Sequence, residues 1–209
     1  MIEIKPAIIS SSFSEIKARI DFLEGVVPWV HLDIMDGRFV EPTTWQVAND
    51  LKEILGQIKI EAHLMINQPE EVLPFWLDNV DRVIIHLEST DHLAEIIDRI
   101  KLGHVRLGLA LKLETPIEEV LPFAEHLDLI QLMSIKKIGY HGELFDLSVL
   151  EKISALRSQL PNVKIQVDGG LNLDTANLVV EAGANILVAG SAIWQSTDPL
   201  ALIKKFEAI

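Results

Sequence analysis

The segment WVHLDIM at residues 29–35 combines the composition of a short buried strand with two titratable side chains, His31 and Asp33. Side chains two positions apart on a strand point to the same face, and in a barrel that face can be the interior. Interior strand positions are normally apolar, and an uncompensated buried charge is costly. The pattern therefore indicates a strand that carries two mutually compensating polar groups.

Short β-branched runs of this kind recur along the chain and alternate with amphipathic stretches of about ten residues, a pattern typical of βα units around a parallel sheet. The predicted strands are Ile4–Ile9, Trp29–Met35, Ile58–Met65, Arg82–Leu87, Arg106–Leu111, Leu127–Ile135, Lys164–Asp168 and Ile186–Ala189. The predicted helices are Ser14–Glu24, Gln46–Leu55, Glu70–Asn79, His92–Lys101, Ile117–Glu125, Ser148–Gln159, Leu173–Ala182 and Pro199–Ala208. The alternation favours one closed (β/α)8 TIM barrel over residues 1–209, although an open doubly wound sheet is compatible with the same count.

The ends of several predicted helices are marked by glycine. Gly25, Gly103 and Gly183 each follow a predicted helix at the position where a left-handed residue ends it, so we expect a left-handed conformation at all three.

The bulk composition is that of a globular protein: 49% of the 209 residues are hydrophobic and 23% are charged, so a sizeable core is expected without cross-links. The sequence contains no cysteine, which excludes disulfides and thiolate metal sites and suits a reducing cytoplasm. A formal net charge of −13 argues against a nucleic-acid partner. No apolar run reaches the roughly 18 residues of a membrane span, so no membrane association is expected.

Two further titratable residues end predicted strands. His63 lies in EAHLM at residues 61–65, and Asp168 lies in QVDGG at residues 166–170. Active sites of (β/α)8 barrels are built at the carboxyl ends of strands, where His31, Asp33, His63 and Asp168 would all lie. Taken singly, each residue is explained by a structural hydrogen bond or a turn. Taken together, two imidazoles and two carboxylates predict a site for one divalent ion, Zn²⁺, Mn²⁺, Fe²⁺ or Co²⁺.

Four segments connect the chain to a known family: His31-Leu32-Asp33-Ile34-Met35-Asp36-Gly37, His63-Leu64-Met65, Val167-Asp168-Gly169-Gly170 and Val188-Ala189-Gly190-Ser191-Ala192. In these segments the chain resembles the ribulose-phosphate 3-epimerase family, and the resemblance runs from Pro6 to about Pro199.

The resemblance implies that His31, Asp33, His63 and Asp168 bind a divalent metal and that Asp33 and Asp168 are the catalytic acid and base. It implies inversion of carbon 3 of a ketose phosphate, D-ribulose 5-phosphate to D-xylulose 5-phosphate, through an enediolate that the metal stabilises. Two carboxylates suit this reaction, because a proton leaves one face of a planar intermediate and another arrives on the opposite face. No organic cofactor is implied.

Glycines near the expected phosphate position are candidate substrate contacts. Gly169, Gly170, Gly190 and Ser191 follow the last two predicted strands, where such barrels commonly bind phosphate with backbone amides. Gly139 and Gly142 lie in the spacer 136–146, which corresponds to a loop that closes over the sugar phosphate in the family. A Gly-Gly or Gly-Ser pair alone is usually only a turn, and the joint location of the two pairs after the last two strands favours the phosphate contact.

The methionines at predicted strand ends are weaker candidates. Met35, Met65 and Met133 match a methionine cluster beneath the enediolate in the family, and they are explained equally well as fillers of irregular core gaps.

The chain departs from the family pattern at three places. After the first aspartate motif the family usually continues with His-Phe-Val-Pro-Asn, whereas this chain has Arg38-Phe39-Val40-Glu41-Pro42. The usual Pro-Ser of the first strand is Pro6-Ala7, with Ser10 as a possible replacement hydroxyl. The usual loop Asn-Pro-Gly-Phe-Gly-Gly-Gln is replaced by KKIGYHGE at residues 136–143. Arg38, Lys136, Lys137 and His141 are candidates for new phosphate contacts, and a solvated loop is the alternative for each. The remaining histidines, His86, His92, His104 and His126, are interpreted as structural or surface residues.

These departures leave other functions open. An epimerase for another ketose phosphate, such as a hexulose 6-phosphate, is one alternative, and a non-catalytic sugar-phosphate-binding barrel is another. A decarboxylase on the same type of barrel is disfavoured, because its Asp-x-Lys-x-x-Asp pattern would require a lysine that the segment Asp33–Asp36 lacks. A homo-oligomer is possible, and no exposed apolar stripe in the sequence identifies an interface.

Overall fold

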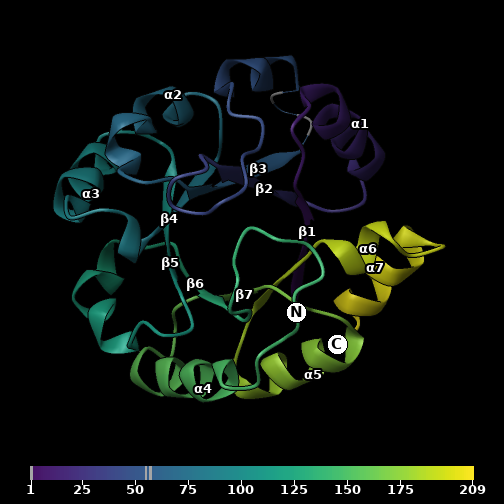
Figure 1. Cartoon of the computed structure of the whole chain (residues 1–209). Coiled ribbons are helices and arrows are strands. Elements are labelled where there is room, and N and C mark those ends of the chain that lie inside the picture. Colours follow the sequence, from purple (N-terminus) through teal and green to yellow (C-terminus); the bar gives the residue numbers. More distant parts are fainter. Residues whose placement is uncertain (1, 55, 57) are drawn as a thin grey trace.

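Eight parallel strands close into a barrel in chain order, with β1 hydrogen-bonded to both β2 and β8 (Figure 1). The computed structural model describes residues 2–54, 56 and 58–209. The strands are β1 Glu3–Ile8, β2 Trp29–Met35, β3 Lys59–Met65, β4 Arg82–His86, β5 Arg106–Leu111, β6 Leu129–Met133, β7 Ile165–Asp168 and β8 Ile186–Ala189. Every predicted strand is confirmed, and the pairing of β1 with β8 excludes the open sheet.

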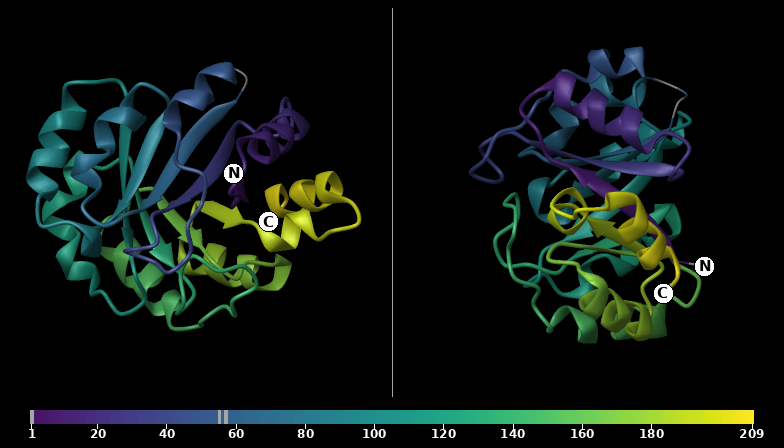
Figure 2. Two further views of the ribbon diagram at one scale, coloured as in Figure 1. Left: turned by 45° about the horizontal axis from the view of Figure 1, so that its top comes forward. Right: turned by 90° about the vertical axis from the view of Figure 1, so that its right-hand side faces the viewer.

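Helical segments surround the barrel on its outside (Figures 1 and 2). The α-helices are α1 Phe13–Leu23, α2 Leu73–Leu77, α3 Leu93–Lys101, α4 Val149–Gln159, α5 Leu173–Ala182, α6 Ser191–Trp194 and α7 Pro199–Glu207. The 3₁₀ segments are η1 Ala48–Glu53, η2 Pro69–Glu71, η3 Leu87–Ser89, η4 Ile117–Glu119 and η5 Leu121–His126. Within the described ranges, no helix is long and apolar enough to cross a membrane.

Three predicted α-helices differ from the structure. The stretch 117–125 forms two 3₁₀ segments, and 70–79 divides into η2 and the short helix α2. Pro122 and Pro74 explain both differences, because proline has no amide hydrogen for the bond that an α-helix requires. The predicted helix Gln46–Leu55 is the 3₁₀ segment η1, and its predicted last residue, Leu55, lies outside the described residues. Asp50 in η1 accepts a bond from the Trp45 indole at 3.0 Å, a local alternative to helical hydrogen bonding.

The predicted glycine ends are confirmed at two of three positions. Gly25 and Gly183 have φ values of 73° and 117°, whereas Gly103 is not among the glycines with positive φ, so that prediction was wrong. At Gly103 the chain continues as a turn, with its amide bonded to the Ile100 carbonyl at 3.0 Å. The short helix α6, which follows β8, was not predicted, because four residues are too few to show a helical period.

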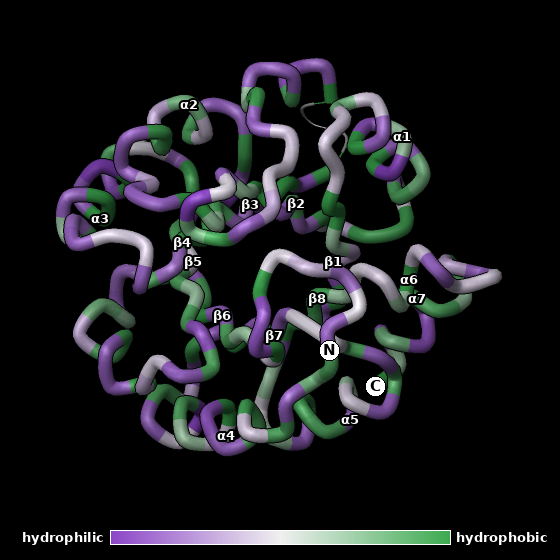
Figure 3. Tube along the Cα trace, viewed as in Figure 1, coloured by the Kyte–Doolittle hydropathy of each residue, from purple (hydrophilic) through white to green (hydrophobic). Residues whose placement is uncertain are grey.

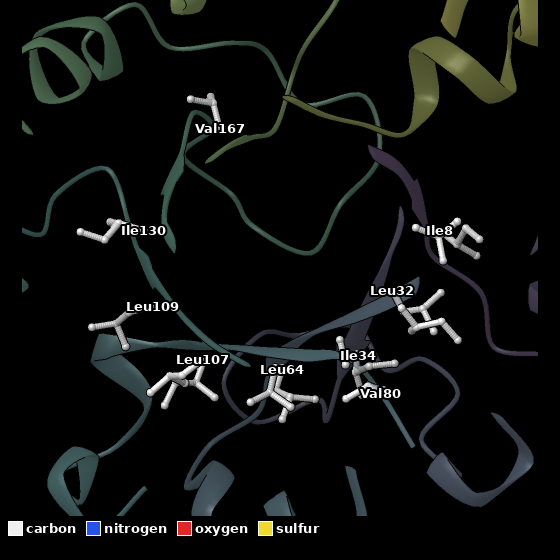
Figure 4. Close-up of a cluster of buried hydrophobic side chains, with 14 of the residues drawn as sticks. Ile8, Leu32, Ile34, Leu64, Val80, Leu107, Leu109, Ile130 and Val167 are labelled. Carbon is white, nitrogen blue, oxygen red and sulfur yellow. The ribbon is translucent and has the colours of Figure 1, made fainter. Parts of the chain in front are cut away.

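The hydrophobic core lies between the strands and the surrounding helices. Ile8, Leu32, Leu64, Leu107 and Ile130 point outward from the barrel strands into this layer (Figure 4). All five are at most 3% exposed, and burying each such side chain contributes about 1.5–3 kcal/mol. The surrounding helices are amphipathic, and the tube in Figure 3 shows hydrophobic and hydrophilic residues alternating along them.

The inside of the barrel is polar beneath its mouth. Fully or almost fully buried charged and amide side chains alternate with the outward apolar residues along the strands, at Lys5, Glu61, Arg82, Gln131 and Gln166. They hydrogen-bond to one another across the barrel. Buried polar groups are tolerated only when they are hydrogen-bonded, so each member of this layer requires its partners. The layer places these polar groups directly below the carboxyl ends of the strands.

Candidate metal centre and substrate pocket

The four predicted metal ligands come together at the carboxyl ends of β2, β3 and β7. Each of His31, Asp33, His63 and Asp168 offers one ligand atom, and these atoms all lie within 4.8 Å of one another. Strand register explains the meeting, because Asp33 pairs with His63 across β2 and β3 and Asp168 ends β7. The prediction that these residues lie together is confirmed.

Asp33 and Asp168 approach the same two imidazole nitrogens. Asp33 Oδ1 lies 3.2 Å from His31 Nε2 and 3.0 Å from His63 Nδ1. Asp168 Oδ2 lies 3.7 Å and 3.5 Å from the same two nitrogens. Two nitrogen and two carboxylate donors converging on one point fit a single divalent ion of the Zn²⁺, Mn²⁺, Fe²⁺ or Co²⁺ type.

Each histidine has a polar partner on the side away from the ligand atoms, a buried carboxylate for His31 and the imidazole of His86 for His63. Glu61 Oε1 lies 2.7 Å from His31 Nδ1. His63 Nε2 lies 3.0 Å from His86 Nε2, and His86 Nδ1 lies 3.2 Å from Glu88 Oε2. Such partners fix which nitrogen of a metal-binding histidine carries the proton.

Sequence reasoning missed Glu61 and Gln131 and gave His86 only a structural or surface role. The available signal was strand alternation, because Glu61 lies two residues before His63 and therefore on the same face of β3. Likewise, Gln131 lies two residues before Met133 on β6, and His86 ends β4.

The two aspartates are electrostatically different. Burial opposes ionisation of Asp33, but His31 and His63 hold the pKa of its carboxyl well below the usual range. Burial and the nearby charge of Asp33 raise the pKa of Asp168 to about 6. A pair of carboxylates with separated pKa values is the arrangement expected for an acid and a base in one site.

The two buried histidines on β2 and β4 also differ. Burial disfavours the His31 cation, but the Asp33 charge and hydrogen bonds to Asp33 and Glu61 raise the pKa of His31 to about 10. Burial lowers the pKa of His86 to about 4, so its ring is neutral at pH 7 and can accept a hydrogen bond from His63.

A small pocket opens beside the two aspartates. Its walls come from the ends of β1, β2, β3, β6, β7 and β8 and from the loop 136–146. The predicted site residues that line it are Asp33, Met65, Met133, Gly139, His141, Gly142, Asp168, Gly169, Gly170, Gly190 and Ser191. Every predicted phosphate-loop residue therefore faces one pocket together with both predicted acid-base groups.

Gly169 and Gly170 have backbone shapes that other residues rarely adopt. Their φ values are 114° and 63°, and a Cβ atom at Gly170 would lie 2.7 Å from the Phe145 nitrogen. The loop after β7 can therefore pass close to the β6–α4 loop only because residue 170 has no side chain.

We expect Gly170→Ala to lower the free energy of unfolding by about 2–4 kcal/mol, since it combines a left-handed strain of about 1–2 kcal/mol with a backbone clash. Gly25→Ala is the matched control, because Gly25 has a φ of 73° but no atom within 4 Å of the position that a Cβ would take, so only the strain remains. Urea unfolding measures both values. Equal losses in the two variants would contradict the close approach at Gly170.

The methionines form a small buried cluster at the mouth. Met35, Met65 and Met133 pack with Val40, Ile135 and Ile138. Met65 and Met133 line the pocket, whereas Met35 lies behind Gly139, whose Cβ would be 3.1 Å from the Met35 sulfur. The cluster thus forms an apolar wall beside the aspartates.

The basic candidates lie at the surface of the mouth. Arg38 is exposed, and the exposed Lys136 pairs with Asp146 at 3.4 Å. Lys137 lies 3.8 Å from Glu41 and 3.8 Å from the centre of the Tyr140 ring. Tyr140 also donates a hydrogen bond to Glu41, so the loop 136–146 is joined to the loop after β2 across the mouth. Of these basic residues and His141, His141 is the one that lines the pocket.

The residue of the first strand that differs from the family pattern, Ala7, also lies at the pocket. Ala7 lines it, whereas Ser10 donates to Glu15 Oε2 at 2.6 Å at the start of α1. Ser10 is therefore engaged elsewhere and does not replace the hydroxyl that the family pattern would place at residue 7.

The closed parallel barrel, with a two-histidine, two-aspartate group at the carboxyl ends of its strands and a pocket beside it, defines a (β/α)8 barrel enzyme with a candidate divalent-metal site. Residues 3–194 match the Ribulose-phosphate 3 epimerase family. The chain belongs to this family.

Curated relatives agree with this assignment, and a solved structure shares the fold. The ribulose-phosphate 3-epimerase of Bacillus subtilis is 35% identical over 206 residues, covering 95% of this chain and 94% of the relative. The cytoplasmic isoform of the Oryza sativa subsp. japonica enzyme is 34% identical over 204 residues, covering 94% and 89%. The 3-hexulose-6-phosphate synthase from Salmonella typhimurium shares the fold, with a TM-score of 0.75 at 16% identity over 99% of this chain and 97% of that chain.

Proposed function

We propose that the protein epimerises carbon 3 of a ketose phosphate and interconverts D-ribulose 5-phosphate and D-xylulose 5-phosphate. The observation that carries the proposal is the placement of Asp33 and Asp168, from strands on different sides of the barrel, within one metal-ligand group at a pocket lined by the phosphate-loop glycines. Membership of the ribulose-phosphate 3-epimerase family supports it.

In this reaction one aspartate takes the proton from carbon 3, and the electron pair moves to the carbonyl at carbon 2 to form an enediolate. The other aspartate delivers a proton to the opposite face of carbon 3. Asp33, which the histidines keep ionised, is assigned as the base, and Asp168, whose raised pKa of about 6 makes it the more readily protonated of the two, is assigned as the acid. In the reverse direction the two roles exchange.

We propose that His31, Asp33, His63 and Asp168 hold one divalent first-row metal ion and that no organic cofactor takes part. When bound, the ion supplies Lewis-acid stabilisation of the negative charge on the substrate oxygens. The convergence of four nitrogen and oxygen donors favours this assignment, and so do the hydrogen-bond partners of the two histidines, Glu61 for His31 and His86 for His63.

The phosphate is proposed to lie against the loops after β7 and β8, at Gly169, Gly170, Gly190 and Ser191, with Gly139, His141 and Gly142 closing over it. Backbone amides and small residues suit phosphate at this end of a barrel. Met65 and Met133 would then exclude water from the reacting carbon.

The test follows carbon 3 directly. Protein loaded with Mn²⁺ or Zn²⁺ is incubated with D-ribulose 5-phosphate in D₂O, and NMR is expected to show D-xylulose 5-phosphate with deuterium at carbon 3. A chelator-treated sample is the control and should show little conversion. Absence of exchange with every pentulose and hexulose phosphate tested would rule the function out.

A second candidate substrate is a hexulose 6-phosphate. The pocket contains Ala7, Tyr140 and Glu143 where the family pattern has other residues, so its shape near the sugar differs from that pattern. Comparing kcat/KM for pentulose and hexulose phosphates separates the two substrates, and binding without proton exchange would indicate a non-catalytic barrel.

We further propose that residues 1–209 act as one catalytic domain in the cytoplasm, which the closed barrel and the cysteine-free sequence support. Assembly into a homo-oligomer is implied by the resemblance, and sedimentation equilibrium measures it.

A further inference from the structure

Directly beneath the metal ligands lies the polar layer of the barrel interior, of which Lys5, Glu61, Gln131 and Gln166 are each 0% exposed. They come from β1, β3, β6 and β7, and their side chains meet in the barrel centre. Barrel interiors are normally filled by branched apolar residues, and well-packed apolar groups are often as stabilising as buried ions. Stability alone therefore does not account for this layer.

The hydrogen bonds of Glu61 determine which nitrogen of His31 carries a proton. Glu61 Oε2 accepts from Lys5 Nζ and from Arg82 Nη1, each at 2.5 Å. Glu61 Oε1 accepts from Gln166 Nε2 at 2.8 Å and faces His31 Nδ1 at 2.7 Å. A carboxylate surrounded by donors can only accept, so His31 Nδ1 carries the hydrogen. When the ring is neutral, as a metal ligand must be, the lone pair of His31 therefore lies on Nε2, the atom that faces Asp33 and His63.

Lys5 determines the orientation of two amides that lead to Asp168. The Lys5 ammonium can donate hydrogen bonds but cannot accept them. The Gln166 atom that lies 2.7 Å from Lys5 Nζ must therefore be the oxygen Oε1. The Gln166 amide nitrogen is therefore turned toward Gln131 Oε1, at 2.7 Å. This in turn directs the Gln131 amide nitrogen to Asp168 Oδ2, at 3.1 Å.

We propose that Lys5 and Glu61 are positioning residues that orient the metal ligands: Glu61 presents His31 Nε2 to the ion, and Lys5, through Gln166 and Gln131, supplies a hydrogen bond to Asp168. The proposal rests on the proposed metal-dependent function and assigns part of that function to residues that contact neither substrate nor metal.

The first experiment tests the effect of Glu61 on His31. Glu61→Gln replaces an oxygen that only accepts with an amide that must direct a donor toward Lys5, Arg82 or His31. We expect the affinity for Zn²⁺, measured by chelator competition, to fall about 10–100-fold. In the Zn²⁺-loaded wild-type protein, the His31 Nδ1–H proton should give a downfield, slowly exchanging NMR signal that is lost or shifted in the variant.

Asp128→Asn is the matched control, because Asp128 belongs to the same ion network through Arg82 but touches none of the four ligands. It makes the same carboxylate-to-amide change and should lower Tm while leaving Zn²⁺ affinity and the His31 signal as in the wild type. Equal Zn²⁺ affinity in Glu61→Gln and wild type would overturn the role of Glu61. Failure of the wild type to bind Zn²⁺ would instead overturn the proposed metal site.

The second experiment tests the amide relay with a neutral variant that avoids leaving a buried charge unpaired. Gln166 bonds to Lys5, Glu61 and Gln131 but to none of the four ligands. In Gln166→Met the Gln131 amide loses the donor that fixes its orientation, so we expect kcat to fall about tenfold, as for loss of one hydrogen bond, with KM unchanged. A shifted pH profile of kcat should accompany it. Unchanged kcat and pH profile in a folded Gln166→Met protein would overturn the relay.

Discussion

Asp168→Asn should lower kcat for carbon 3 epimerisation by about 10²–10⁴-fold, the usual contribution of one positioned acid-base group. The asparagine side chain keeps the size of the aspartate and can still accept from Gln131, so the barrel should remain folded. It cannot deliver a proton to carbon 3, and it weakens the ligand set by one charge. NMR of substrate and product at quenched time points in D₂O measures kcat, and thermal unfolding followed by circular dichroism measures Tm.

Asp98→Asn on α3 is the control for this change, because Asp98 is a surface residue with a side chain that is 82% exposed. It should leave kcat within about twofold of the wild type, as expected for an exposed surface substitution. Asp33→Asn should be at least as damaging as Asp168→Asn, since Asp33 approaches both histidines more closely. A fully active Asp168→Asn protein would exclude Asp168 as the acid.

Metal affinity should fall steeply as the pH is lowered, because metal ligands must lose their protons before they bind. In the metal-free site the pKa of His31 is raised to about 10, so at pH 7 the ion must displace one proton from its imidazole. The pKa of Asp168 is raised to about 6, so below that pH a second proton must also leave. The apparent Kd should increase about tenfold per pH unit from pH 9 to 6 and about a hundredfold per unit below pH 6.

Calorimetry in buffers of different ionisation enthalpy measures the proton release, which should be about one per ion at pH 7 and approach two near pH 5. Asp168→Asn provides the comparison, because asparagine has no carboxyl proton to release when the ion binds. In this variant the steeper pH dependence of the apparent Kd below pH 6 should disappear. A Kd independent of pH between 6 and 9 would show that His31 does not carry a proton in the metal-free site.

The architecture follows closely from local patterns. The segments 29–35, 106–111 and 186–189 were predicted to the residue as β2, β5 and β8, because outward apolar residues and flanking turns mark both ends of a strand. The incorrectly predicted helices are stretches in which single residues disfavour the α-helix that the apolar periodicity indicates. Pro74 and Pro122 interrupt otherwise periodic stretches, and a period of 3.6 residues does not distinguish an α-helix from 3₁₀ turns over so short a length.

The candidate site was predicted only in part. His31 and Asp33 are recognisable from one strand because polar residues there break an apolar pattern, and His63 and Asp168 repeat the signal at other strand ends. Lys5, Glu61 and Gln131 break the same pattern, but they lie farther from the strand ends where chemistry is expected. Their role depends on partners up to 161 residues away in the chain, as in the bond between Lys5 and Gln166.

The sequence by itself determined the alternation of strands and helices, the family and the four candidate ligands, since each depends on residue types and spacing within short segments. Only the tertiary structure decided that β1 closes on β8, that the ligands converge within 4.8 Å, and that Glu61 and His86 stand behind His31 and His63. The physical reason is that proton position and pKa depend on burial and on charges brought together across the barrel, which spacing along the chain does not specify.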